Sequence, residues 1–379
     1  TMGDEERKLG IHASSTRQVF FNDTNVPVDH MLAGRGEGFK IAMNALNVGR
    51  IKLGAACLDA QRRVISCSVK YANERIQFNT PIAQFGAIKE KLARMATSCF
   101  AGESATYRAA NDVELKIKSF EAEGLSHQQA ELKGVEEFAI ECSIIKVGAS
   151  EDIQSCADDG IQIYGGMGFS AETPIESAWR DARIGRIYEG TNEINRMLSV
   201  GMLLKKAMKG KIDLMGAVMR ATGEIKNQQS ETSDTFQGDL SAEIIQVKNL
   251  KKVFLILTGS AFQKYGAELE KHQQVLLSLA DILIETYFAE SALLRTLKNI
   301  GKENDAESQK AMTKLYVFDA TEIVLRKGKE IIGNIANVKE KTKLLKGVHQ
   351  LCLYEDLPDV ISLKTQIADL LIAENKYCF

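Results

Sequence analysis

Proline is scarce in this sequence, and its distribution limits what the chain can fold into. The four prolines in 379 residues are Pro27, Pro81, Pro174 and Pro358. The stretches 82–173 and 175–357 therefore contain none. Because proline costs about 3 kcal/mol inside a helix, proline-free stretches of this length are free to form long helices. Aromatic residues make up only 7% of the chain, and together these features predict a mostly α-helical protein.

Composition excludes several classes of protein. The 48 basic and 50 acidic residues give a net charge of −2, whereas a nucleic-acid-binding protein usually shows a basic excess. No apolar run approaches the roughly 18 residues of a membrane span, and the acidic, polar N-terminus is unlike a signal or transit peptide. The seven scattered cysteines form no C-x-x-C pair. This pattern favours a reducing compartment and predicts neither a metal site nor a disulfide framework.

The spacing of apolar residues predicts a helical bundle in the first half of the chain. Steps of three to five residues between apolar positions predict helices over 41–71, 84–118 and 127–159, and a fourth that starts near Thr191. Ser126 stands at the end of the break Gly124-Leu125-Ser126 and is expected to cap the third helix. Long helices joined by short loops indicate an antiparallel four-helix bundle.

Two other regions flank the predicted bundle. Residues 17–21 and 26–28 are predicted to form a strand pair, which is too small for a stable sheet, so we expect the chain to begin inside a β domain. The polar stretch 222–241 is the best linker candidate, and helical spacing returns beyond it, as over 306–335. The expected organisation is a β remnant over 1–32, the four-helix bundle over 33–210, a linker over 211–241 and an appended all-helical domain over 242–379.

A short segment before the predicted fourth helix is the best candidate for chemistry. It contains Glu189 followed by Gly190. Glycine lets a ligand approach the backbone closely, and the N-terminus of a helix offers free N–H groups to a carbonyl oxygen or an anion. A carboxylate that a bound substrate desolvates becomes more basic. By itself, however, a Glu-Gly pair before a helix is more often an ordinary loop.

Four longer blocks resemble those of the acyl-CoA dehydrogenase family, and they stand in the family's order. They are KLGIHASSTRQVFFNDTNVPVDHML at 8–32, YANERIQFNTPIAQFGAIKEKLARMAT at 71–97, IQIYGGMGFSAETPIESAWRDARIG at 161–185 and RIYEGTNEINRML at 186–198. The helical stretch after residue 198 resembles the appended domain of the very-long-chain subgroup. The resemblance implies that the chain is the C-terminal part of such a protein.

The resemblance also implies an activity, which is the FAD-dependent α,β-dehydrogenation of long-chain acyl-CoA thioesters in fatty acid β-oxidation. Glu189 falls on the position of the family's base, which removes the α-proton while the β-hydride goes to flavin N5. In the family, the backbone N–H at this position and a ribityl hydroxyl of FAD polarise the thioester carbonyl, as an oxyanion hole does. Without the family's N-terminal and β domains, we expect this chain alone to bind FAD weakly and to be nearly inactive.

The family's binding residues transfer onto this sequence position by position. The positions that match substrate contacts are Asn47, Arg50 and Gly190. Those that match contacts to the diphosphate and adenosine of FAD in the neighbouring subunit are Arg75, Gln77, Phe78, Gln162, Gly165 and Gly166. Thr191, Asn192 and Glu193 match FAD contacts at the start of the fourth helix. The sequence departs from the family's common pattern at Asn79 and at Phe85 and Gly86, which leaves side-chain contacts to the cofactor at 85–86 in doubt.

The partners implied by the resemblance are an acyl-CoA substrate, electron-transfer flavoprotein and a second copy of the chain, with no nucleic acid. The lysine-rich stretch 203–211 is compatible with a weak peripheral membrane contact, but such a stretch is more often a solvated helix end whose lysines complement the helix dipole. The implied location is the cytoplasm of a bacterium, or else the mitochondrial matrix or inner-membrane surface. Two alternatives stay open: a non-catalytic helical scaffold or assembly protein derived from the family, and an acyl-CoA oxidase.

Overall fold

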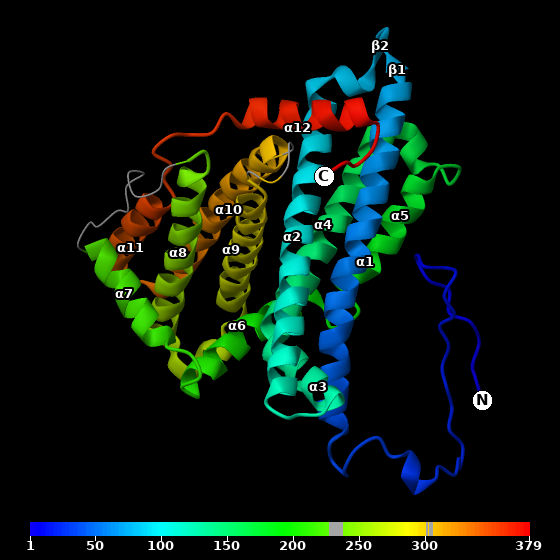
Figure 1. Cartoon of the computed structure of the whole chain (residues 1–379), viewed down its shortest axis with the longest axis vertical. Coiled ribbons are helices and arrows are strands. Elements are labelled where there is room, and N and C mark those ends of the chain that lie inside the picture. Colours follow the sequence, from blue (N-terminus) through cyan, green and yellow to red (C-terminus); the bar gives the residue numbers. More distant parts are fainter. Residues whose placement is uncertain (227–237, 301, 303–305) are drawn as a thin grey trace.

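The computed structural model describes residues 1–226, 238–300, 302 and 306–379, and it confirms the expected helical architecture (Figure 1). A bundle of long, nearly parallel rods forms one half of the molecule, and a second helical layer packs beside it. Among the described residues, no helix combines the length and apolarity that crossing a bilayer demands.

The first half of the chain supplies the bundle. Its α-helices are α1 (Gly38–Glu74), α2 (Gly86–Ala122), α3 (His127–Glu137), α4 (Ala139–Tyr164), α5 (Pro174–Arg183) and α6 (Asn192–Met208). Short 3-10 turns connect them: η1 (Val28–His30), η2 (Ile82–Gln84), η3 (Gly165–Phe169) and η4 (Ile184–Arg186). The tip between α1 and α2 is an antiparallel hairpin of β1 (Ile76–Gln77) and β2 (Thr80–Pro81), in which Ile76 pairs with Pro81.

The helix predicted over 127–159 is in fact two helices, because the chain turns at Phe138. The amide of Phe138 donates to the carbonyl of Glu136 instead of extending the regular helical pattern. The turn lets α3 fold back on α2, where a Cβ on Gly134 would stand 2.5 Å from Ile117. The expected cap of α3 is confirmed, since the Ser126 hydroxyl accepts from the Gln129 amide at 3.4 Å within a reciprocal capping box.

The N-terminal segment pairs differently from the expected strand pair. Residues 16–20 run alongside residues 1–6 rather than 26–28, with an isolated bridge between Met2 and Val19. The segment is anchored to α5, where the Asp181 carboxylate accepts from the Ile11 amide at 2.5 Å. Nearby, the Arg180 guanidinium donates to the Leu9 carbonyl at 2.9 Å.

The second half of the chain forms the other helical layer. Its elements are α7 (Leu214–Lys226), α8 (Ser241–Tyr265), η6 (Gly266–Lys271), α9 (Gln273–Asn299), α10 (Ala306–Ile335), α11 (Val338–Leu351) and α12 (Val360–Glu374). The segment 211–241, expected as a linker, therefore contains α7, and its residues 227–237 lie outside the described residues. The last helix, α12, crosses back to contact α2 (Figure 1).

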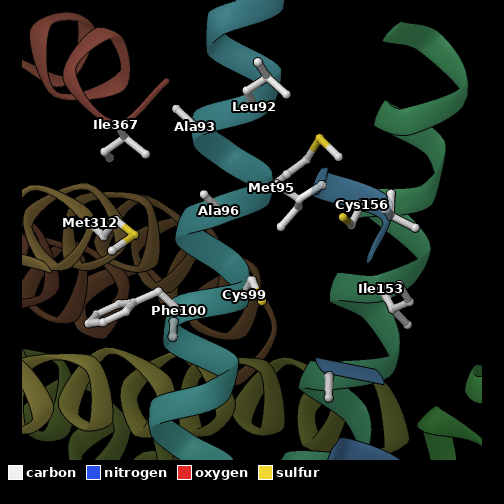
Figure 2. Close-up of a cluster of buried hydrophobic side chains, with 14 of the residues drawn as sticks. Leu92, Ala93, Met95, Ala96, Cys99, Phe100, Ile153, Cys156, Met312 and Ile367 are labelled. Atoms are coloured by element: carbon white, nitrogen blue, oxygen red, sulfur yellow. The ribbon is translucent and has the colours of Figure 1, made fainter. Parts of the chain in front are cut away.

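Helix α2 is buried on both sides and joins the two layers. Figure 2 shows Met95 pointing toward Cys156 of α4, whereas Phe100 points to the opposite side, where Met312 of α10 lies. Phe100 is 0% and Met95 1% exposed. Ile367 of α12 covers the same side of α2 as Met312. At about 25 cal/mol per Å² of apolar surface, this double burial makes α2 a principal source of hydrophobic stabilisation.

A buried ion pair reinforces the same junction. The Glu103 carboxylate on α2 is 1% exposed and accepts from Arg62 of α1 at 2.5 Å and from Arg295 of α9 at 2.9 Å. A buried carboxylate with two charged donors is fully compensated, but removing one partner of such a group typically costs about 3–5 kcal/mol. Glu103 therefore fixes α1 and α9 relative to α2.

An acidic cavity of about 180 Å³ also lies between the layers, lined from α2, α4, α9 and α10. Asp152, Glu285 and Asp319 face it, together with Arg94, which binds Asp159 at 2.6 Å. The Tyr316 hydroxyl donates to Glu285 at 3.1 Å. Burial raises the pKa of Glu285 to about 7, even though the Tyr316 hydrogen bond lowers it. Burial likewise raises the pKa of Asp152 and that of Asp319.

We predict that Glu285→Gln stabilises the protein at pH 8. The folded state holds the Glu285 proton more tightly than the unfolded state, so the contribution of this group is present below pH 4.5 and is lost as pH rises through about 7. Glutamine avoids ionisation and still accepts from Tyr316. At about 1.4 kcal/mol per pKa unit, the shift from 4.5 to about 7 gives an expected gain on the order of 3 kcal/mol at pH 8, which vanishes below pH 4.5 and is measured by urea unfolding. Exposed Glu172→Gln is the control, and a pH-independent effect of Glu285→Gln contradicts the prediction.

Candidate active site

The loop between η4 and α6 holds an unusual backbone conformation. Glu189 has φ of 57° and Gly190 has φ of 83°, so both adopt the left-handed region. Gly190 does so without a steric penalty, but a non-glycine residue there costs on the order of 1–3 kcal/mol and persists only where its surroundings fix it. The conformation of Glu189 must therefore be imposed by contacts.

Side chains from three helices provide those contacts by binding the loop's carbonyl oxygens. Arg50 Nε of α1 donates to Glu189 O at 3.2 Å, and Lys146 Nζ of α4 donates to Gly190 O at 2.7 Å. Asn195 Nδ2 of α6 lies 3.3 Å from Glu189 O, 2.7 Å from Gly190 O and 3.1 Å from Thr191 O. Two cationic side chains and one amide side chain therefore hold the carbonyl oxygens of this loop.

Arg50 and Asn47 act together on α1. Arg50 is 2% exposed, and its Nη1 donates to Asn47 Oδ1 at 3.0 Å. Burial lowers the pKa of Arg50, and the nearby Glu189 charge opposes that shift. Both residues were expected to contact substrate. In the structure Arg50 holds the Glu189 carbonyl, and Asn47 accepts from Arg50, so the pair also supports the loop that carries Glu189.

The Glu189 side chain lies against Gly49 of α1. A Cβ at Gly49 would stand 2.5 Å from Glu189 Oε2, so the absence of a side chain there makes room for the carboxylate. Oε2 is buried and has no hydrogen-bond partner among the described residues. The Glu189 amide likewise has no recorded acceptor in the described part of the chain. The half-buried residue therefore offers both an unpaired acceptor oxygen and an unpaired donor N–H.

A groove of about 740 Å³ runs beside this loop, between α1 and α5. Leu53, Ala56 and Cys57 of α1 form one wall, and Ile175 and Ala178 of α5 form the other. Tyr188, the residue before Glu189, also lines the groove and is 41% exposed. An apolar groove that passes next to a carboxylate can hold an extended hydrocarbon with its polar end at Glu189.

The three residues at the start of α6 that were expected to bind the cofactor differ in where their side chains lie. Thr191 caps the helix by accepting from the Ile194 amide at 3.3 Å, and Glu193 is exposed in the first turn. Asn192 is 1% exposed and faces inward. Its side chain accepts from Lys146 at 2.6 Å and donates to Glu151 at 2.9 Å. The Asn192 side chain therefore serves the interior rather than a ligand.

The other expected cofactor residues lie at the opposite end of the bundle. They are Arg75, Gln77, Phe78, Gln162, Gly165 and Gly166, and all six are exposed. Stacking of Tyr71 on Tyr164, with ring centroids 4.1 Å apart, holds the ends of α1 and α4 together there (Figure 1). At about 1.5 Å per helical residue, Gly49 and Arg75 lie about 39 Å apart along α1. One chain thus carries two separate groups of expected site residues.

Three residues that support the Glu189 loop were not identified from the sequence: Lys146, Asn195 and Ser150, whose hydroxyl accepts from Asn192 at 3.0 Å. A signal was present for Lys146, which interrupts the apolar run Ile144-Ile145-Lys146-Val147. A lysine flanked by core residues of a helix suggests a buried polar partner. Asn195 and Ser150 carried no comparable signal.

We predict that Asn195→Asp destabilises the protein by about 2 kcal/mol or more, because it replaces a donor to three carbonyl oxygens with an acceptor of the same shape. Urea unfolding at pH 7 measures the effect. The matched control is Asn334→Asp, since Asn334 is exposed and its side-chain oxygen accepts from Tyr265 at 2.6 Å, which aspartate can also do. Equal stability of the two variants would show that Asn195 does not hold the loop.

Comparison with known proteins identifies the family of this chain. A family model described as "Acyl-CoA dehydrogenase, C-terminal domain" matches residues 36–203, and a second model with the same description matches residues 249–350. The first match contains α1, the Glu189 loop and most of α6, and the second covers most of the other helical layer.

Curated and solved proteins show the same relationship. A probable acyl-CoA dehydrogenase of Bacillus subtilis (strain 168) is 41% identical over 320 residues, which are 84% of this chain and 54% of that protein. A very long-chain specific acyl-CoA dehydrogenase of Bos taurus is 30% identical over 338 residues, 84% of this chain and 49% of that protein.

The crystal structure of an acyl-CoA dehydrogenase complexed with FAD from Bacillus anthracis superposes with a TM-score of 0.97 at 36% identity. That superposition covers 100% of this chain and 64% of the solved one. The chain spans about half the length of the curated relatives it matches. The two matched models, the relatives and the shared fold show that the chain belongs to the acyl-CoA dehydrogenase family.

Proposed function

We propose that this chain carries the proton-abstracting part of an FAD-dependent acyl-CoA dehydrogenase that acts on long-chain acyl-CoA thioesters in fatty acid β-oxidation. The observation that carries the proposal is the unpaired carboxylate oxygen of Glu189, on a loop that is strained yet firmly anchored, beside an apolar groove. Strained residues with unsatisfied polar atoms are typical of functional sites.

The chemistry follows from the groups at the loop. An α-C–H bond is acidic enough to be broken only when the adjacent carbonyl is polarised, and the unpaired N–H of Glu189 is available to donate to that oxygen. Glu189 then takes the α-proton as general base. When bound, FAD supplies the acceptor for the β-hydride at flavin N5, so that the thioester leaves with an α,β double bond. Electrons would pass onward to electron-transfer flavoprotein.

The preference for long acyl chains is supported by two features. The groove of about 740 Å³ extends along α1 from Leu53 to Cys67, and its walls are largely apolar. In addition, similarity to the very long-chain specific enzyme of Bos taurus extends over 84% of this chain. A long hydrocarbon gains about 0.8 kcal/mol for each buried CH₂ group, which favours long substrates in a groove of this length.

The end of the bundle that carries Arg75, Gly165 and Gly166 is suited to the diphosphate and adenine of a dinucleotide. Arg75 is exposed and has no recorded side-chain partner in the described ranges, so its guanidinium is available to phosphate oxygens. No atom lies within 4 Å of a Cβ placed on Gly165 or Gly166, which leaves their backbone open to a ligand. Phe78 is 90% exposed and can stack on a base.

We further propose that the chain works as a homodimer. With Arg75 about 39 Å from Gly49 along α1, one dinucleotide cannot reach both Glu189 and Arg75 of the same chain. Each bundle end would therefore bind the FAD whose flavin lies at the partner's Glu189. Exposed apolar side chains at that end, Ile76 at 60%, Phe78 at 90% and Phe169 at 91%, are consistent with a covered surface.

A weak membrane contact belongs to the same proposal. Lys205, Lys209 and Lys211 lie near Met208, which is 64% exposed, at the end of α6. Cations beside an exposed apolar side chain suit the surface of an anionic bilayer. Binding to anionic vesicles that is lost at high salt would support this contact, and equal binding to neutral vesicles would count against it.

We predict that Glu189→Gln lowers dehydrogenation about 10²–10⁴-fold, because the amide cannot accept the α-proton. The assay supplies FAD, palmitoyl-CoA and an artificial electron acceptor and records the turnover rate. Glu172→Gln, on an exposed glutamate, is the matched control. Because the curated relatives contain about as much sequence again, we expect slow turnover from the 379-residue chain alone.

The outcomes separate the candidate functions. Loss of turnover in Glu189→Gln with retained FAD binding supports the proposed base. Unchanged turnover in that variant places the base elsewhere. A folded wild-type chain that shows no flavin binding even at high FAD concentration supports a non-catalytic scaffold. Rapid consumption of oxygen without an added acceptor supports an oxidase.

We predict that Arg75→Leu weakens FAD binding about tenfold or more, because it removes a charged donor to the diphosphate. Flavin fluorescence titration measures the affinity, and sedimentation measures the mass of the assembly. Arg63→Leu is the control, since Arg63 is an exposed arginine on the same helix that pairs with Asp59. A strictly monomeric chain that binds FAD normally would contradict the arrangement between subunits.

A further inference from the structure

Lys146 is a buried cation that the proposed chemistry does not use. It lies on α4 with 0% exposure, inside the bundle beneath the Glu189 loop. Its two recorded hydrogen bonds go to neutral oxygens, Gly190 O at 2.7 Å and Asn192 Oδ1 at 2.6 Å. Neither bond compensates its charge as a carboxylate would.

Burial of a lysine in this way destabilises the folded state. Moving an ammonium group out of water costs several kcal/mol unless it is well paired. Here burial, followed by the charge of Arg50, lowers the pKa of Lys146 to about 8 from its ordinary value of 10.5. An apolar side chain among Ile144, Ile145 and Val147 would pack without this penalty. The lysine therefore needs an explanation other than the stability of the bundle.

The position of the two hydrogen-bond acceptors of Lys146 supplies such an explanation. Gly190 O belongs to the peptide that follows the left-handed pair Glu189 and Gly190, and Asn192 is the first residue of α6. Lys146 thus ties the end of the strained loop to the start of the helix that follows. The preceding peptide is held separately, since Arg50 and Asn195 both bind Glu189 O.

Two consecutive peptide planes with fixed carbonyl directions define the backbone torsions between them. Here these are the torsions at Gly190, and they fix the peptide that follows Glu189 relative to the start of α6. The position of that peptide in turn limits where the Glu189 carboxylate can lie, which is in the space left by Gly49. Without the Lys146 bonds, the second plane would keep only the Asn195 amide, which is shared among three carbonyl oxygens.

We propose that Lys146 is a positioning residue that holds Gly190 O and Asn192 Oδ1, and thereby fixes the Gly190 backbone on which the direction of the Glu189 carboxylate toward bound substrate depends. The inference rests on the proposed function for the role of Glu189. The tether itself is a property of the fold and can be measured without turnover.

The test compares hydrogen exchange in Lys146→Met, Lys146→Gln and Lys118→Met of the full 379-residue chain. Methionine keeps the length of the side chain but removes the donors, and glutamine keeps an amide on a shorter side chain. Lys118 is an exposed lysine on α2 paired with Glu114 at 3.2 Å, which makes it the control. Mass spectrometry follows peptides that cover residues 189–196 and, as a reference for global stability, residues 92–105 of buried α2.

We expect amide exchange over 189–196 to accelerate about tenfold or more in Lys146→Met while exchange over 92–105 stays as in the wild type. If Lys146→Met does not fold, Lys146→Gln decides by the same comparison, because its shorter side chain loses at least one acceptor. Unchanged exchange over 189–196, or equal acceleration of both regions, overturns the positioning role and leaves Lys146 as a general stabiliser.

A second readout separates this inference from the proposed function. In the FAD-loaded protein with palmitoyl-CoA, we expect kcat to fall about 10- to 100-fold in the Lys146 variants with KM unchanged, since a base displaced by about 1 Å loses rate rather than substrate binding. If turnover of the wild-type chain is too slow to measure, the hydrogen-exchange comparison alone decides the positioning role. A loss confined to KM, with kcat intact, counts against the positioning role.

Discussion

The burial of α2 on both of its sides is the constraint on which the rest of the structure depends. Its small and apolar residues pack against α4 on one side and against α10 and α12 on the other, and Glu103 binds arginines of α1 and α9. These contacts fix α1 and α4 relative to each other. Gly49 and Arg50 on α1 and Lys146 on α4 consequently converge on one loop, although nearly 100 residues separate them in sequence.

Much of the fold was predictable because helical periodicity and caps are local properties. The helix over 306–335 was predicted at its observed bounds, and those of α1 and α2 were predicted to within a few residues. The break at Phe138 and the pairing of residues 1–6 with 16–20 were not, because both depend on which distant segment offers a better contact. Likewise, the polar composition near 211–241 did not reveal α7, whose formation depends on packing against α8.

The candidate site was predictable in position but not in detail. The blocks around 161–198 located Glu189, yet a sequence motif does not tell which of its side chains faces a ligand and which faces the interior. Arg50 and Lys146 bind the carbonyl oxygens of Glu189 and Gly190, because these loop carbonyls have no acceptor role in a helix or strand and need interior donors. Asn192 is buried against Lys146 and Ser150 for the same reason, since its side-chain oxygen is a further acceptor there. The supporting side chains come from α1 and α4, so only the assembled bundle identifies them.

The separation of the two residue groups along α1 has a consequence for inheritance. In the proposed homodimer, each catalytic centre is a joint product of two polypeptides, with the carboxylate from one and the phosphate-binding tip from the other. A substitution at the phosphate-binding tip of one chain would then inactivate the catalytic centre that contains the partner's carboxylate. The centre that contains the chain's own carboxylate would stay active. In a cell that makes both intact and altered chains, each mixed dimer would retain one working catalytic centre. The residual activity would then depend on how the two kinds of chain pair, and not only on the amount of intact chain.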